Sequence, residues 1–84
     1  MTLEEIIELY PEEEFLKADG FDSSIIGVDP SSMKLVYDRE LMLNSLLETS
    51  NITITDALEY LEFNVFSAHM GDKTPIYIET NTNI

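Results

Sequence analysis

Hydrophobic residues recur at three- and four-residue steps between Thr55 and Gly71, which is the longest helical pattern in the chain. The positions on one face of this helix are Leu58, Leu61, Val65 and Ala68, and the stripe is widened by Ala57, Tyr60 and Phe63. Thr53 or Thr55 can cap its start, Gly71 is a suitable stop, and Pro75 prevents the helix from resuming. We therefore expect this helix to carry much of the core.

Two short helices are predicted before Gly20. Thr2 and Glu5 have the spacing of a capping box, in which each side chain bonds the backbone N–H of the other residue. The apolar face of this first helix would consist of Leu3, Ile6, Ile7 and Tyr10. Pro11 interrupts the pattern but suits the first position of a second helix, whose first turn would hold the acidic run 12–14 and which would end at Gly20.

Three segments resemble β-strands. The β-branched run 24–29 is followed by the turn-forming residues Asp29–Ser32, and an alternating run at 33–37 completes a predicted hairpin. Gly27 inside the first strand indicates a bulge or a close backbone approach. A third strand is predicted at 75–79, with Pro75 at its start.

A further helix over 39–48, capped by Asp38, completes the predicted order of elements. We therefore expect an α+β fold, in which a three-stranded antiparallel sheet is packed mainly on one face by about four helices, two short N-terminal ones and two longer central ones. The chain would form a single small domain over 1–84, with an acidic helical segment at 1–18 and a frayed tail at 80–84.

Charge is the unusual feature of the composition. The chain has 17 acidic residues against four lysines and arginines, a net charge of −13, and no cysteine. This charge disfavours direct binding to nucleic acids or anionic membranes, and it favours a basic protein partner whose attraction weakens with salt. The alternative is that the acidity only keeps the protein soluble. The acidic N-terminus is unlike a signal peptide, so a cytoplasmic protein is expected.

No catalytic or metal-binding pattern emerges from the sequence. The acidic run around Asp19 and Asp22 fails as a calcium loop, because Phe21 and Pro30 occupy the third and twelfth ligand positions. His69 is the only histidine, so it has no second histidine for a zinc site. We expect a protein without enzymatic activity, without a cofactor and without a bound metal.

Five residues are predicted to have structural roles: Gly20, Gly27, Asn64, Gly71 and Pro75. Asn64 lies next to the apolar face of the long helix, so its amide is expected to be buried. A buried amide needs hydrogen-bond partners. The backbone of the Gly27 bulge or of the Thr74–Pro75 turn could supply them.

Several segments together resemble a family of small proteins encoded by phages and prophages. The resemblance rests on DGFDSSIIGVD, the strand end LVYD, ITDALEYLEFNVFSAHMG and TPIYI, and it covers roughly residues 19–78. It implies a phage or mobile-element origin and assigns no catalytic residue. The acidic segment 1–18 lies outside the matched pattern.

Two hypotheses of function follow. In the first, a basic host protein is bound by an acidic surface in which carboxylates replace the phosphates of a nucleic acid, as in an anti-defence inhibitor. That surface would consist of Glu4, Glu5, Glu8, Glu12, Glu13 and Glu14; with collinear helices, Glu4, Glu8 and Glu12 would repeat at about 6 Å. In the second, an accessory or self-associating subunit uses an apolar patch made by Tyr60, Phe63 and Phe66. Monomer and homodimer are both compatible with the pattern.

Overall fold

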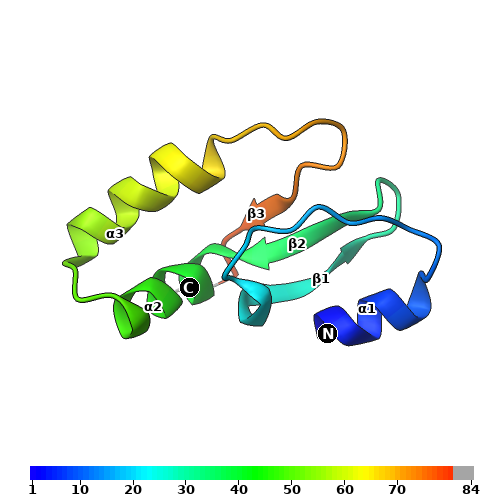
Figure 1. The fold of residues 1–84 in the computed structure, drawn as a ribbon, viewed down its shortest axis with the longest axis horizontal. Coiled ribbons are helices and arrows are strands. Elements are labelled where there is room, and N and C mark those ends of the chain that lie inside the picture. The colour runs from blue at the N-terminus through cyan, green and yellow to red at the C-terminus, as the bar shows by residue number, and fades with distance from the viewer. Residues whose placement is uncertain (81–84) are drawn as a thin grey trace.

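A central sheet separates two helical ends of the molecule in the computed structural model, which describes residues 1–80 (Figure 1). Helix α1 lies at one end, and helices α2 and α3 lie at the other. The elements in chain order are α1 (Leu3–Leu9), β1 (Ile25–Asp29), β2 (Lys34–Asp38), α2 (Arg39–Thr49), α3 (Ile54–Leu61) and β3 (Ile76–Ile78). A 3-10 helix at Asp22–Ser24 precedes β1, and a π-helical segment at Glu62–Phe66 continues α3. The mixed α+β class is confirmed, with three α-helices instead of about four.

The sheet has the strand order β1-β2-β3 and mixes both pairing directions. Strands β1 and β2 form the predicted antiparallel hairpin, and their register shifts between Ile25 and Gly27, which confirms the bulge. Strand β3 runs parallel to β2, so the prediction of a purely antiparallel sheet was wrong. Parallel neighbours need a long crossover, and here α2 and α3 carry the chain back to the end of the sheet where β2 begins.

The hairpin turn is built by Asp29. Its carboxylate accepts hydrogen bonds from the Ser31 backbone N–H and from the hydroxyls of Ser31 and Ser32. These hydrogen bonds lower the pKa of the Asp29 carboxyl. The largest contribution comes from the Ser32 hydroxyl, followed by the hydroxyl and the backbone N–H of Ser31. Met33 has a φ of 54°, so it belongs to the turn, and β2 begins one residue later than predicted.

The N-terminal segment is helical only in its first part. The capping box of Thr2 and Glu5 is confirmed, with both reciprocal hydrogen bonds in place. The predicted second helix is absent: residues 13–18 have no regular secondary structure and follow a short turn at Pro11. The reason is tertiary, because the Ala18 N–H donates a 2.8 Å hydrogen bond to the buried Tyr37 hydroxyl, which an uninterrupted helix would prevent.

The two central helices begin where the sequence predicts, but α3 ends earlier than predicted. Asp38 caps α2 and Thr53 caps α3. The regular helix of α3 stops at Leu61, and the π-helical segment ends at Phe66, five residues before the predicted stop at Gly71. A π-helical turn changes the direction of the side chains that follow it. The later positions of the predicted stripe are therefore less buried than predicted: Val65 packs against the core but is only half-buried, and Ala68 is also half-buried.

The core lies between the hairpin, α1, α2, α3 and the segment that leads into the 3-10 helix. Its buried members are Ile6, Ala18, Phe21, Ile25, Leu35, Tyr37, Met42 and Leu61. Met42 is the buried residue of α2, whereas the neighbouring Leu41 is exposed. Most of the predicted frayed tail, 81–84, lies outside the described residues, and Thr80 donates a hydrogen bond to the Asp38 carboxylate.

Candidate functional site

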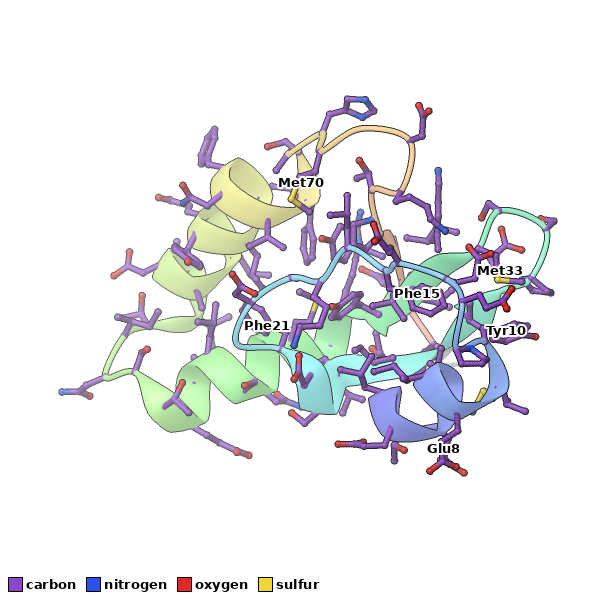
Figure 2. The ribbon with its side chains drawn as sticks, turned by 45° about the vertical axis from the view of Figure 1, so that its right-hand side comes forward. Glu8, Tyr10, Phe15, Phe21, Met33 and Met70 are labelled. Atoms are coloured by element: carbon purple, nitrogen blue, oxygen red, sulfur yellow. The ribbon has the colours of Figure 1, made fainter. Side chains whose placement is uncertain are left out.

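The six N-terminal glutamates lie on α1 and on the non-helical segment that follows it, and all of them are exposed. We call this set the N-terminal acidic surface: Glu4, Glu5, Glu8, Glu12, Glu13 and Glu14. Glu8 projects from α1 away from the sheet (Figure 2). Glu5 is engaged in the capping box, where the Thr2 backbone N–H lowers the pKa of its carboxyl, and Glu13 pairs with Lys73 at 3.0 Å. The other four make no ion pair with the chain across residues 1–80.

The regular spacing expected along this surface is absent. Helix α1 ends at Leu9, and the backbone of 12–14 is not helical. The expectation that Glu4, Glu8 and Glu12 continue along one helix axis was therefore wrong. The carboxylates form a negatively charged surface without a helical repeat.

The three aromatic residues of the predicted apolar patch face different surroundings. Phe63 is 78% exposed and Tyr60 is 46% exposed. Phe66 is half-buried, and its ring lies 5.2 Å from that of Tyr77. Tyr60 instead borders a small hollow that also contains Phe21 and Met70. The three rings therefore differ in exposure and in the side chains that they contact, and their joint use as a patch stays a prediction.

A groove between α2 and α3 brings together residues that the sequence analysis did not combine. Its volume is about 520 Å³. Its apolar lining is Leu43 on α2, Leu58 and Leu61 on α3, and Phe66 after α3. We call this cavity the α2–α3 groove. Leu61 is fully buried, while Leu58 is 48% exposed, so the groove combines a packed base with an apolar wall open to solvent.

Charged side chains also line the α2–α3 groove. The acidic ones are Glu40, Glu62 and Glu79, and all three are exposed. The single cation is Arg39, whose guanidinium carbon lies 4.4 Å from the centre of the Phe66 ring. This distance is that of a cation–π contact. Arg39 is thereby held against an aromatic face, and the exposed charge of the groove is negative.

Sequence reasoning missed this groove because it depends on the packing of two helices. The sequence analysis placed Leu58 on the apolar face of the long helix. The spacing of residues cannot show that α2 covers only part of the Leu58 side chain. Glu62 follows Leu58 by four residues, so the two share one helix face. That pairing is the one local signal of the groove. Glu40 and Glu79 come from distant parts of the chain.

The predicted structural residues have mixed outcomes. Gly20 and Gly71 have φ values of 90° and 98°, which favour glycine, and Pro75 directly precedes β3. Gly71 lies in the turn to Thr74 and not at the end of α3. The prediction for Asn64 was wrong: its side chain is exposed and donates to the Tyr60 carbonyl within the same helix.

The described residues form no recognisable metal site. His69 is exposed, and over the described part of the chain no three acidic or histidine side chains gather where they could hold a metal ion. Within the same residues, no helix has the length and apolar character needed to cross a membrane. Comparison of the chain with protein-family models, with curated proteins and with solved structures finds no match.

Proposed function

We propose that this chain is a non-enzymatic interaction protein that binds a positively charged partner protein through the N-terminal acidic surface. The observation that carries the proposal is the free charge of that surface, where Glu4, Glu8, Glu12 and Glu14 are exposed and engage no cation within residues 1–80. Such a field accelerates encounter with a basic surface, and the attraction weakens as salt screens it.

A narrower form of the proposal is that the partner is a nucleic-acid-binding protein of a host cell, whose phosphate-binding surface the carboxylates occupy. The net charge of −13 supports this form, together with the resemblance to phage-encoded proteins. Without a helical repeat at 12–14, the contact would depend on charge density and not on phosphate-like spacing.

The test is capture of proteins from a bacterial lysate on the immobilised chain at low and high salt, with identification by mass spectrometry. The decisive variant carries Glu4→Lys, Glu8→Lys and Glu14→Lys. Its matched control carries Glu48→Lys, Asp56→Lys and Glu59→Lys, three exposed sites on α2 and α3 that change the net charge equally. We expect a basic protein that is lost with the first variant, kept by the second and released by salt.

Equal loss with both triple variants would show that total charge, and not this surface, attracts the partner. Retention by both would contradict the proposal outright. Circular dichroism of each variant shows whether the fold is intact.

A second candidate function rests on Phe63. A phenyl ring that is 78% exposed adds apolar surface without contributing to the core. An accessory or self-associating subunit would use such a ring at a contact that resists salt. Phe63→Ser would then abolish a salt-resistant contact, which sedimentation analysis or the same capture experiment would detect.

A further inference from the structure

We propose that the α2–α3 groove binds a basic amphipathic segment of a protein, which seats apolar side chains on the leucines of the groove and places lysines or arginines beside its glutamates. This site lies at the opposite end of the molecule from α1 (Figure 1). It does not depend on the function proposed for the N-terminal acidic surface.

The apolar part of the groove is suited to a side-chain anchor. Leu58 is 48% exposed although it lies on α3 beside the fully buried Leu61. Leu43 extends the apolar wall onto α2. Covering such surface removes apolar area from water, which favours binding. A cavity of about 520 Å³ has room for a few large side chains, within the range of about 300–1,000 Å³ typical of binding sites.

The charged part of the groove selects the occupant. Glu40 comes from α2, Glu62 from the π-helical segment after α3, and Glu79 from the position that follows β3, so acidic groups approach the cavity from three parts of the chain. None of them takes part in a salt bridge among residues 1–80. The cation of the groove, Arg39, already lies against Phe66. An entering lysine or arginine therefore meets carboxylates that have no competing partner.

Charge complementarity also argues against other occupants. A second copy of this chain would bring another net charge of −13 to the site, and nucleic acids and anionic lipids would be repelled in the same way. A groove between two helices is a recurrent binding site for an amphipathic helix whose anchors lie at i, i+3, i+4 and i+7. A basic amphipathic helix satisfies both the apolar and the acidic lining.

The probe is a fluorescein-labelled peptide of about 15 residues, with leucines at i, i+3, i+4 and i+7 and lysines on the flanking positions. The control peptide has the same composition with the leucines scattered around the helix, so its charge is identical. Binding of each to the full chain is measured by fluorescence anisotropy at low and moderate salt. We expect the amphipathic peptide to bind at least about tenfold more tightly than the control.

Two variants locate the site. Leu58→Glu places a charge in the apolar wall, and we expect it to weaken the amphipathic peptide at least about tenfold. The triple variant Glu40→Gln, Glu62→Gln and Glu79→Gln removes the acidic lining, and we expect a similar loss. The matched control is Glu4→Gln, Glu8→Gln and Glu14→Gln, which removes the same charge at the α1 end; we expect less than about a twofold change.

Equal weakening by the two glutamine triples would overturn the inference, because net charge alone would then explain binding. Unchanged affinity of the Leu58→Glu variant, or equal affinity of the two peptides, would also overturn it. If the wild-type chain forms a dimer in sedimentation analysis and Leu58→Glu is monomeric, the occupant is a second copy and the inference is wrong. Circular dichroism and thermal unfolding of each variant establish that a loss of binding is not a loss of fold.

Discussion

The two ends of the molecule are both acidic, but they present their charge in different ways. At the α1 end, exposed glutamates stand on a short helix and on a non-helical segment, and the same helix also exposes Ile7 and Leu9. At the other end, three glutamates border a cavity lined by leucines and Phe66. The first arrangement attracts cations over a distance, and its glutamates do not share one cavity: Glu4 and Glu14 border two separate hollows. The second can distinguish one basic segment from another, because an apolar anchor must also fit.

This difference separates two kinds of contribution to binding. Long-range charge mainly changes the rate of association, and buried apolar contacts mainly change the rate of dissociation. Changes at the α1 end should therefore alter association and its salt dependence. Changes at Leu58 should alter the lifetime of a complex.

The largest expected effect concerns the core residues that support each end. Leu61 under the groove and Ile6 of α1 are both fully buried. Replacing either by alanine leaves a cavity, and we expect a loss of about 2–5 kcal/mol in the free energy of unfolding, measured by urea denaturation. Because α1 packs on β1 and is followed by a non-helical segment, hydrogen exchange should show that Ile6→Ala frees mainly the amides of α1. If amide exchange in the Ile6→Ala variant were accelerated equally in α3, the prediction that α1 opens separately from the other end would be wrong.

The next effect concerns Tyr37, which ties the N-terminal segment to the sheet through Ala18. Burial raises the pKa of its phenol from 10.0 to about 12. Only the neutral phenol suits this site, so its contribution to stability is complete below pH 10 and is lost as the pH rises towards about 12. We expect denaturant titrations to show a decreasing free energy of unfolding across that window.

Tyr37→Phe tests the same contact. The variant leaves the Ala18 N–H without its acceptor, which should lower stability by about 1–3 kcal/mol at neutral pH. As the pH rises above 10, the free energy of unfolding of this variant should decrease less than that of the wild type. Part of the decrease should remain, because burial also raises the pKa of Tyr77. An unchanged alkaline loss would show that Tyr37 is not the group responsible.

A smaller effect compares the helix caps at the two ends. Thr2 caps α1 and Thr53 caps α3 through side-chain oxygens that accept backbone N–H groups. Thr2→Ala and Thr53→Ala should each lower the free energy of unfolding by about 1 kcal/mol. Thr2→Ser and Thr53→Ser should retain most of the stabilisation by the cap, because serine keeps the hydroxyl. Thermal unfolding measures the differences. Alanine and serine variants of equal stability would show that the cap oxygens contribute nothing.

The smallest expected effect is at Phe63. Because its ring is 78% exposed, Phe63→Ser should change the free energy of unfolding by less than about 0.5 kcal/mol. Chemical denaturation checks this value. A large destabilisation would show that the ring packs on the protein in solution, which would remove the basis of the second candidate function.

The features predicted from the sequence are those determined by neighbouring residues. The capping residues Thr2, Asp38 and Thr53 act within three positions of the chain, and the turn at Asp29 is equally local. These interactions need no knowledge of the rest of the fold, so residue type and spacing were sufficient to find them.

The features that could not be predicted depend on distant partners. The run after Pro11 has a helical pattern, but Ala18 bonds to Tyr37 and the run is not helical. The direction of β3 is determined by the crossover through α2 and α3, and the burial expected for Asn64 depends on the turn that ends α3. The α2–α3 groove was missed for the same reason. The N-terminal glutamates were correctly expected to be exposed, and their role in binding stays a prediction.

The two edge strands of the sheet have a consequence for behaviour at high concentration. Unpaired edges offer backbone groups that other chains can extend into intermolecular β-structure. Here β3 is only three residues long and is preceded by a proline without an N–H, while β1 is distorted by the bulge at Gly27. Both edges are poor templates for strand addition, and the high negative charge repels approaching copies. We therefore expect this protein to stay free of fibrils at high concentration.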